Sequence, residues 1–597
     1  MSPHRPTYAW RITWVALALV VTTMVMSPRQ PLGVGLTVLW ALCCALRLER
    51  RSRAWARWET NGVLTTTMAR LEQRPGTGLY LGEAFRWNAN YTQQLEEVIA
   101  ADGALPIAPD FQGGHPALHA VGGRANTRLV VSEVELTGQV GILGTNRSGK
   151  TRLLELLSAE ALRQPGAVIM IDPKGDRGWL ARTALLARRY GRPFHLITTA
   201  FPGSSARMNV LGTATTPAEV GTRIRALMPS APTGQGADSF FTEFSLSVIQ
   251  RVAQAQQIMG HAWTLEGIYG PCMIEDRRAA LLGTYLRHLG YPGAGDHAKK
   301  AIGWYRHTRC PDLVADGLIT DYEAPRDYLM KVTGGLIPAF DGVIGDPLGP
   351  LLSAVGDGLT WERIDREGMV VYVSLASLLF GDIANRVARV ILQDLIGFLG
   401  RRYAYDDVTH VPPLTVFVDE LGDVAYPHFV NAINKGGGAN ARFILAMQSL
   451  ADPEVAIGRE QTRRIMDNLN TKIWCRLADD WTAKQATDGW GTCQVVFPDN
   501  GIGLSVGGVG GLSGSSQRRF AARETPLMRP SWLTALPRGH AMARVKGEIW
   551  KLQIPLLPPI DRSTLDDLGL TALWERLDPH TVSAVQAEVP ASLESTP

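Results

Sequence analysis

Features that would point to several other classes of protein are scarce in this sequence. The 597 residues contain six cysteines, and none of them forms a C-x-x-C pair or lies beside a histidine at metal-ligand spacing. The sequence therefore predicts reduced thiols and no structural zinc site. The net charge is only +4, which neither supports nor excludes a nucleic-acid partner. Zinc-finger and helix-turn-helix patterns are also absent, so any DNA binding should be directed at the phosphate backbone and sensitive to salt.

Long apolar runs occur only at the start of the chain. Residues 12–26 and 32–46 are apolar and are separated by the short, turn-forming segment 27–31. Arginines cluster before the first run and after the second, whereas only Arg29 lies between the two. Positive charge is retained on the cytoplasmic side of a membrane. The pattern predicts a two-helix transmembrane hairpin, with both termini and the bulk of the chain in the cytoplasm.

The rest of the chain is too long for a single core, so several domains are expected. Apolar runs of strand length occur at residues 140–143, 168–171, 369–375, 414–418, 443–447 and 473–477, with a last strand pair at 541–545 and 550–554. Helix-like segments separate most of these runs. Strands that alternate with helices predict an α/β fold with a mostly parallel sheet. Between the second and third strand, helical periodicity dominates, which indicates an all-helical insertion. The Gly/Ser-rich segment 501–516 is interpreted as a mobile loop.

These patterns divide the chain into six parts. The predicted parts are 1–60, a transmembrane hairpin with a basic juxtamembrane segment; 61–135, a small β-rich N-terminal portion; 136–217, the first half of the α/β domain; 218–326, an all-α insertion domain; 327–560, the second half of the α/β domain; and 561–597, a C-terminal tail.

The strongest chemical signal is a complete G-x-x-x-x-G-K-T motif between a strand and a helix. It comprises Gly144, Thr145, Asn146, Arg147, Ser148, Gly149, Lys150 and Thr151. In such a P-loop the backbone N–H groups wrap phosphates, and the following helix points its positive end at them. Lys150 is expected to contact the β- and γ-phosphates of ATP, and the Thr151 hydroxyl to ligate Mg²⁺.

A P-loop also requires carboxylates that hold Mg²⁺ and activate water. The strand at 414–418 runs directly into Asp419 and Glu420. We assign Asp419 to the metal and Glu420 to the attacking water. Asp172 also ends an apolar strand, but Pro173 and Lys174 follow it in place of a second acid. The pair Asp419 and Glu420 is therefore the preferred assignment.

A polar amide follows the strand at 443–447. Gln448 at this position, beside the nucleotide, is expected to sense the γ-phosphate or to hold the attacking water. An isolated glutamine at a strand end is more often a surface residue. Its occurrence with the two preceding motifs favours the functional interpretation.

The order of these features resembles the TraD/TraG/VirD4 coupling proteins of bacterial conjugation. It consists of the N-terminal hairpin, the P-loop, the D-P-K-G-D run at 172–176, the helical insertion, Asp419-Glu420 and Gln448. The runs at 81–87 and 434–438 look closest to TraD proteins of integrative conjugative elements. The resemblance implies a RecA-like, FtsK/HerA-like P-loop NTPase that forms a hexameric ring at the inner membrane. It also implies that the protein links single-stranded, relaxase-bound DNA to a type IV secretion channel.

One position departs from the related motors. In FtsK-like motors an arginine shortly before the sensor glutamine reaches the nucleotide of the neighbouring subunit, whereas Gly437 holds that position here. Lys435 and Arg442 are nearby cations that could replace it, and each is as readily an ordinary surface or packed residue. The sequence leaves the trans-acting finger open between them.

Three other functions share the same motor motifs. A double-stranded DNA translocase of the FtsK type usually carries a C-terminal DNA-reading domain, for which the tail after residue 570 is short. A secretion ATPase that acts only on proteins uses the same core. A docking receptor whose nucleotide only holds a ring together would not need the water-activating Glu420.

Overall fold

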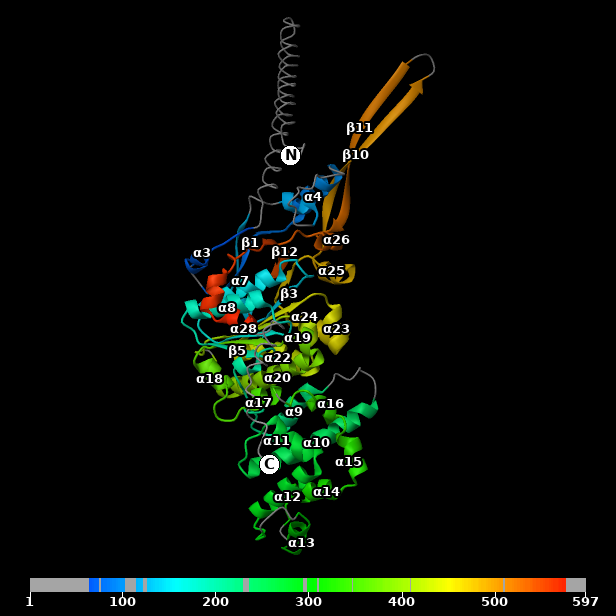
Figure 1. The fold of residues 1–597 in the computed structure, drawn as a ribbon. Coiled ribbons are helices and arrows are strands. Elements are labelled where there is room, and N and C mark those ends of the chain that lie inside the picture. Colours follow the sequence, from blue (N-terminus) through cyan, green and yellow to red (C-terminus); the bar gives the residue numbers. More distant parts are fainter. Residues whose placement is uncertain are drawn as a thin grey trace.

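The computed structural model describes residues 64–575, apart from 75–76, 102–113, 122–125, 229–235, 294–297, 309–310, 346, 409 and 508–510. The predicted transmembrane hairpin at 12–46 lies outside the described residues. Among those residues, none of the helices has both the length and the apolar character needed to span a bilayer. Figure 1 shows an elongated molecule, with a large sheet in its upper half, a helical region below it and a long β-hairpin that projects from the top.

The central element is an eleven-stranded sheet. In sheet order the strands are β2 (Thr127–Val131), β1 (Leu79–Arg86), β13 (Glu548–Gln553), β12 (His540–Val545), β9 (Thr471–Trp474), β3 (Val140–Leu143), β8 (Ala441–Met447), β7 (Leu414–Val418), β4 (Val168–Asp172), β6 (Val370–Ser374) and β5 (Phe194–Thr198). From β9 to β5 all neighbouring strands are parallel. From β9 to β2 they are antiparallel. The predicted α/β fold with a mostly parallel sheet is confirmed.

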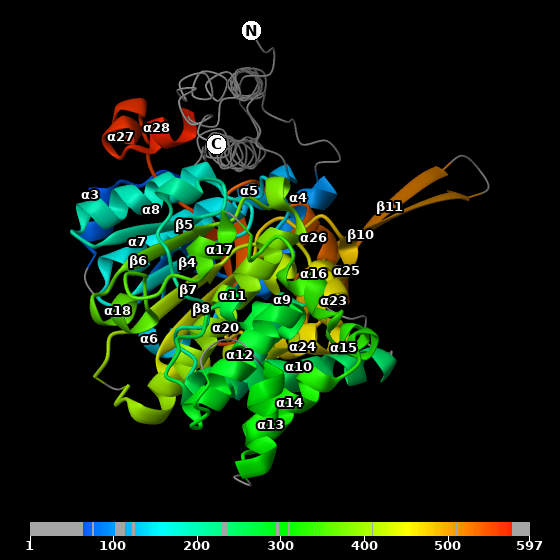
Figure 2. The ribbon, with the colours of Figure 1, turned by 60° about the horizontal axis from the view of Figure 1, so that its bottom comes forward.

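Helices cover both faces of the parallel part of the sheet. Alternate residues of each strand point to opposite faces, so each strand packs against helices on both sides. On one face, Val168 and Met170 of β4 pack with Leu153 of α7 (Lys150–Arg163) and Trp179 of α8 (Arg177–Arg189). On the other face, Ile169 and Ile171 pack in the cluster that contains α20 (Asp382–Tyr405) and α22 (Pro427–Gly436). Figure 2 shows α7 and α8 above the sheet and α20 below it. Burial on both faces explains why these strands are continuous apolar runs.

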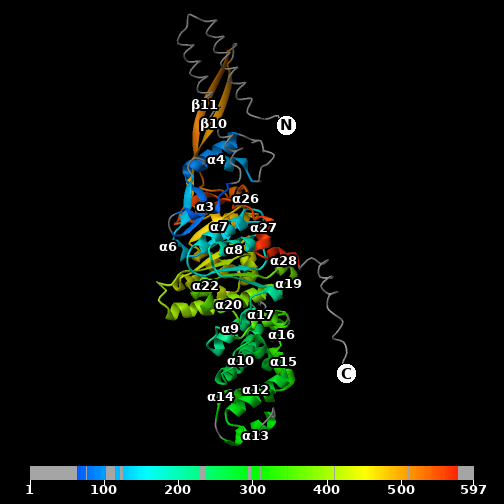
Figure 3. The ribbon, with the colours of Figure 1, turned by 60° about the vertical axis from the view of Figure 1, so that its left-hand side comes forward.

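The helical region lies between β5 and β6 in the chain. Its helices are α9 (Pro217–Leu227), α10 (Gly236–Ile258), α11 (Leu265–Met273), α12 (Glu275–His288), α13 (Ala298–Thr308), α14 (Leu313–Glu323), α15 (Arg326–Thr333), α16 (Leu336–Phe340), α17 (Leu348–Leu352) and α18 (Trp361–Arg366). No strand of the two sheets falls within the described part of 217–366. The helices α15, α16 and α17 continue past residue 326. The region hangs from the sheet domain at the end remote from the hairpin (Figures 1 and 3).

Shorter elements complete the structure. The N-terminal helices are α3 (Met68–Glu72), α4 (Ala89–Ala101), α5 (Pro116–Ala120) and α6 (Glu133–Leu136). Those that follow β6 and β7 are α19 (Ser377–Phe380), α21 (Leu421–Val424), α23 (Ala451–Ile457), α24 (Arg459–Asn468), α25 (Asp480–Thr487), α26 (Pro530–Thr534), α27 (Arg562–Asp567) and α28 (Leu570–Glu575). Two short 3-10 helices, at Pro202–Ser204 and Gly437–Ala439, complete the described elements.

The interpretation of residues 501–516 as a mobile loop is wrong. The chain forms β10 (Thr492–Gly507) and β11 (Gly511–Pro526), which pair antiparallel along their whole length in a separate two-stranded sheet. The hairpin projects beyond the body in all three views (Figures 1 to 3). At its base Gln93 of α4 donates to the carbonyl of Val496 at 2.8 Å and accepts from its N–H at 2.7 Å. Glycine and serine are poor indicators of strands. The composition of this segment therefore did not predict the hairpin, which is held together by backbone hydrogen bonds.

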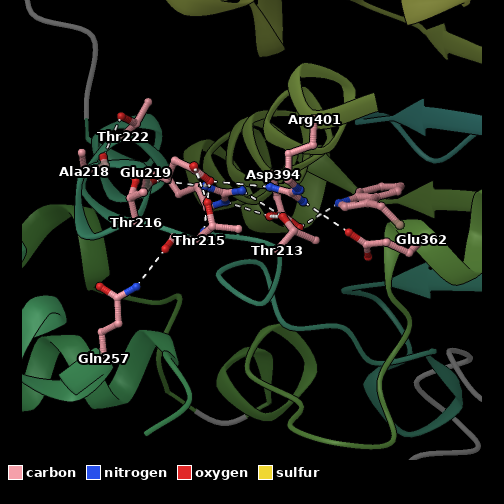
Figure 4. A network of polar contacts seen from close by, with 12 residues as sticks. Thr213, Thr215, Thr216, Ala218, Glu219, Thr222, Gln257, Glu362, Asp394 and Arg401 are labelled. Carbon is pink, nitrogen blue, oxygen red and sulfur yellow. Dashed lines mark hydrogen bonds and ion pairs between the residues drawn. The ribbon is translucent and has the colours of Figure 1, made fainter. Parts of the chain in front are cut away.

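A buried polar cluster joins the helical region to the sheet domain. Asp394 of α20 accepts hydrogen bonds from Thr213, from Arg223 Nε at 2.7 Å and from Trp361 Nε1 at 2.7 Å. Figure 4 shows Asp394 and Thr213 facing each other within this network. Asp394 and Arg223 are almost completely buried. Burial raises the pKa of Asp394, and its partners oppose that effect by favouring the carboxylate.

We predict that Asp394→Ala destabilises the junction strongly. The substitution leaves the Arg223 guanidinium buried without its carboxylate, which costs about 3–5 kcal/mol of unfolding free energy. The thermal midpoint of the purified protein should fall by several degrees. Asp357→Ala is the matched control, because Asp357 pairs with Arg207 on an exposed surface and such pairs contribute about 1 kcal/mol or less. Equal midpoints for the two variants would contradict the prediction.

Candidate nucleotide site

Three neighbouring parallel strands end at the same edge of the sheet and carry the candidate site. β3 leads into the P-loop, β7 leads into Asp419 and Glu420, and β8, which lies between them, leads into Gln448. The Gly144 N–H donates to the Met447 carbonyl at 3.1 Å, and the Thr145 N–H donates to the Arg476 carbonyl at 2.9 Å. The P-loop is therefore fastened to the strands on both sides of β3.

The P-loop has the backbone shape that phosphate binding requires. Gly149 has a φ of +116° and caps α7, so the helix begins at Lys150. Arg147 also adopts a left-handed conformation, with a φ of +62°. Successive turns of this kind expose N–H groups on one side of the loop, where they form a concave anion site. Because the first turn of α7 lies behind this loop, the helix dipole adds to the positive potential.

Lys150 is held between the two carboxylates that follow β7. Its Nζ lies 3.1 Å from Asp419 Oδ1 and 3.2 Å from Glu420 Oε1. Burial lowers the pKa of Lys150, but the two carboxylates outweigh it, so the net shift is upward. Burial raises the pKa of Asp419 against the opposing effect of Lys150. All three groups are buried or nearly so, and the lysine remains charged at neutral pH.

Glu420 is positioned by its backbone and by Gln448. It has a φ of +47° and a ψ of +60°, a left-handed conformation that is strained for a residue with a side chain. Gln448 Nε2 donates to Glu420 Oε1 at 3.0 Å. The amide therefore orients the same oxygen that faces Lys150. The structure brings together Lys150, Asp419, Glu420 and Gln448, which the sequence had assigned to one site from three separate motifs.

The rival acid Asp172 has a structural task. Its carboxylate accepts hydrogen bonds from the N–H groups of Gly175 (2.8 Å) and Asp176 (2.6 Å) and from the Tyr372 hydroxyl (2.6 Å). Burial is the main reason that the pKa of Asp172 is raised, to about 6. These bonds shape the turn after β4, which places Lys174 and Asp176 in the wall of the nucleotide cavity.

The cavity at this edge has a volume of about 440 Å³. Its walls are formed by Thr145, Asn146, Arg147, Gly149, Lys150, Thr151, Arg152, Lys174, Asp176, Asp419, Glu420 and Arg538. Sequence analysis had identified the P-loop residues and the acidic pair. It did not assign Arg152, Lys174, Asp176 or Arg538 to the cavity, and of these Arg152 and Arg538 belong to no motif. Lys174 and Asp176 did lie in the noted D-P-K-G-D run, which was the one available signal.

The two candidate trans-acting cations lie at the opposite ends of the strands. Arg442 is the second residue of β8 and is buried, where it donates to Gln164 Oε1 at 3.2 Å and lies 3.6 Å from Glu133. Lys435, in the last turn of α22, is exposed. In this conformation Arg442 is engaged within its own chain, whereas Lys435 is accessible to a neighbouring molecule.

This strand arrangement agrees with the fold that the motifs had predicted. A P-loop strand is separated from the acidic strand by one further strand, which itself ends in a polar residue, and this order resembles that of RecA-like P-loop NTPases. The plasmid coupling protein TrwB, solved with a non-hydrolysable ATP analogue, shares the fold at 12% sequence identity and a TM-score of 0.50, over 82% of this chain and 97% of that one.

One segment in the second half of the sequence matches a known family model. Residues 413–538 match the family described as the TraM recognition site of TraD and TraG. The match agrees with the resemblance to TraD and TraG proteins that the motif order had indicated. VirB4 of Thermoanaerobacter pseudethanolicus is also similar, at 13% identity and a TM-score of 0.41 over 77% of this chain and 100% of that one. No curated protein sequence matches the chain.

We predict that Gly149→Ala weakens nucleotide binding strongly without unfolding the protein. A Cβ at Gly149 would meet the N and Cα of Gly539 at 3.3 Å, and the φ of +116° is unfavourable for alanine. The P-loop should therefore shift, and the affinity for a fluorescent ATP analogue should fall by at least about tenfold, because a misplaced loop loses several charge-assisted hydrogen bonds. Gly203→Ala is the control, since a Cβ there meets nothing within 4 Å. Unchanged binding by Gly149→Ala would refute the assigned loop geometry.

Proposed function

We propose that this coupling protein binds Mg²⁺-ATP in the cavity at the strand ends and hydrolyses it to drive relaxase-bound DNA into a type IV secretion channel. The observation that carries the proposal is that Lys150, Asp419 and Glu420 line one cavity, while Gln448 from the strand between them donates a hydrogen bond to Glu420. A site that only held nucleotide would need the P-loop but no strained, oriented glutamate beside it. The family match over residues 413–538 supports conjugative transfer as the setting.

The residues present fit a magnesium ion. Thr151 supplies a hydroxyl at the start of α7 and Asp419 a carboxylate, and these oxygen donors are the ligands that Mg²⁺ prefers. The Lys150 ammonium lies between the two carboxylates, so this end of the cavity already accommodates positive charge. When bound, the metal would offset the negative charge of the phosphates.

Glu420 is the proposed catalytic base, and Gln448 its partner in positioning. Asp419 is nearly fully buried, whereas the Glu420 side chain is 14% exposed and borders the cavity. An acid at this place can accept a proton from a water molecule that attacks the terminal phosphate. Gln448 holds the carboxylate oxygen at 3.0 Å and supplies a second polar group for the same water. Lys150 would bind and stabilise the phosphates.

The surroundings of the motor are proposed from the sequence. Residues 12–46 would anchor the protein in the inner membrane, with the ATPase body in the cytoplasm. A homo-hexamer would place a cation from one subunit beside the nucleotide of the next. The exposed Lys435 suits that contact better than the buried Arg442. The cargo would be single-stranded DNA with its relaxase, and the partner would be the type IV secretion channel.

We predict that Glu420→Gln retains nucleotide binding but loses hydrolysis. The amide keeps the shape of the carboxylate and cannot accept a proton, so the rate of ATP hydrolysis should fall by about 10²–10⁴-fold. The affinity for a fluorescent ATP analogue should stay within a few-fold of the wild type. Lys150→Ala is the contrasting variant, because it should lose binding and hydrolysis together. Hydrolysis at the wild-type rate by Glu420→Gln would reassign the base.

DNA dependence distinguishes transfer of DNA from export of protein. We expect single-stranded DNA to stimulate ATP hydrolysis by the full-length chain in detergent, and the stimulation to weaken as salt is raised, because phosphate contacts release counterions. The assay should span protein concentrations that permit ring assembly, with Lys150→Ala as the blank. Activity that ignores DNA at every concentration would favour a protein-export ATPase instead.

A further inference from the structure

One cationic side chain enters the nucleotide cavity from outside the recognised motifs. Arg538 lies on the turn that precedes β12, and it is exposed at the cavity wall. The turn is closed by a hydrogen bond from the His540 N–H to the Pro537 carbonyl at 3.1 Å, with Gly539 at a φ of +77°. Glycine suits the third position of this turn, because the left-handed conformation is unstrained there. Arg538 is thus presented at the second position of a well-defined turn.

The same turn is bonded directly to the P-loop. The Gly539 N–H donates to the carbonyl of Ser148 at 3.1 Å. Gly149 lies so close to Gly539 that an added Cβ would come within 3.3 Å of its backbone. The base of the Arg538 side chain is therefore fixed relative to the residues that wrap phosphate. Any movement of the P-loop when it binds a nucleotide must be accommodated by residues 537–540.

The charge of the cavity leaves Arg538 without an obvious acidic counterpart. Lys150 faces two of the three acids in the wall, Asp419 and Glu420. The third acid, Asp176, caps α8 through a hydrogen bond from the Trp179 N–H at 3.0 Å. The wall also carries the further cations Arg147, Arg152 and Lys174. A cavity with this excess of positive charge is complementary to a polyphosphate, and guanidinium groups bind phosphate oxygens through two parallel N–H donors.

A short, packed segment connects Arg538 to the projecting hairpin. β11 ends at Pro526, and the next residue, Leu527, has a carbonyl that accepts from Trp87 Nε1 at 3.0 Å and from the Thr92 hydroxyl at 2.7 Å. Arg529 then pairs with Glu96 of α4 at 2.5 Å. The segment continues through α26, in which the Leu533 carbonyl accepts from the Leu477 N–H at 3.3 Å. Trp532, Leu533 and Leu536 are buried, so the path from hairpin to cavity has few freely rotating parts.

We propose that Arg538 binds a phosphate group of the nucleotide held by its own subunit, and thereby links occupancy of the cavity to the base of the β10–β11 hairpin. The identity of the ligand rests on the proposed ATPase function, whereas the link rests on the turn and its bonds. Arg538 acts on the nucleotide directly. The segment from 527 to 537 transmits a change in the position of Arg538 to the base of the β10–β11 hairpin.

The test measures nucleotide binding by the full-length chain in detergent. Fluorescent ATP and ADP analogues are titrated into the wild type and into Arg538→Ala, Arg538→Lys, Arg70→Ala and Lys150→Ala. We expect Arg538→Ala to weaken binding of the ATP analogue by about tenfold, because one charge-assisted contact is lost. Arg538→Lys should recover part of this loss. Arg70, exposed on α3, is a matched arginine outside the cavity, and its removal should leave binding unchanged.

Two further readouts separate a ligand contact from a structural role. The thermal midpoint without nucleotide should be the same for Arg538→Ala and the wild type, because the side chain is exposed. The rise of the midpoint on addition of Mg²⁺-ATP should be smaller in the variant. Amide hydrogen exchange of residues 492–497 and 521–537 should slow when Mg²⁺-ATP binds to the wild type, and this slowing should be lost in Arg538→Ala.

Each other outcome overturns a defined part of the proposal. Wild-type affinity in Arg538→Ala would remove the phosphate contact. Reduced affinity with unchanged hydrogen exchange at the hairpin base would remove the link. If the wild type bound no nucleotide, or bound it as well as Lys150→Ala does, the proposed ATPase function would fail and the role of Arg538 with it. A lower thermal midpoint for Arg538→Ala than for the wild type, both without nucleotide, would assign the residue to folding instead.

Discussion

The functional site depends on one constraint, which is that β3, β8 and β7 are parallel neighbours in register. Their carboxyl ends form one edge, so the P-loop, Gln448 and the acidic pair meet although nearly three hundred residues separate the first from the last. Loss of that register by one residue would turn every strand side chain to the other face. The contacts of the buried Lys150 with both carboxylates depend on this register. It is also a buried charge that is acceptable only because its partners are in place.

The chain uses the same strand order to attach two large structures that lie at opposite ends of the molecule. The helical region is inserted between β5 and β6, at one edge of the sheet, and the buried Asp394 network fastens it to α20. The β10–β11 hairpin emerges between α25 and α26, on the side of the antiparallel strands. Insertions of this size are tolerated because they leave the parallel centre of the sheet untouched. The candidate nucleotide site lies between the two, and residues 527–538 connect its wall to the hairpin.

The antiparallel strands give the site a further wall. β12 and β13 continue the sheet beyond β9, and the turn before β12 rests on the P-loop through Gly539 and Ser148. The last part of the sheet domain in the sequence is thus in contact with the first nucleotide-binding motif. This contact places Arg538 beside the P-loop. It also joins the two halves of the sheet domain through a direct backbone hydrogen bond.

Local sequence determined the parts of the site whose chemistry is written in consecutive residues. The P-loop glycines, Lys150 and the Asp419-Glu420 pair were recognisable because each motif contains its own geometry, and the doubly buried strands were recognisable as apolar runs. Their approximate bounds agreed with β3, β4, β6, β7, β8, β9, β12 and β13. Only the tertiary structure decided which strands are neighbours, that Asp172 shapes a turn, and that Arg442 is buried beside Glu133. It also decided that residues 492–526 form a ribbon and that Arg538 reaches the cavity. These outcomes depend on contacts between residues far apart in the chain, and neither periodicity nor composition encodes the partner of a residue.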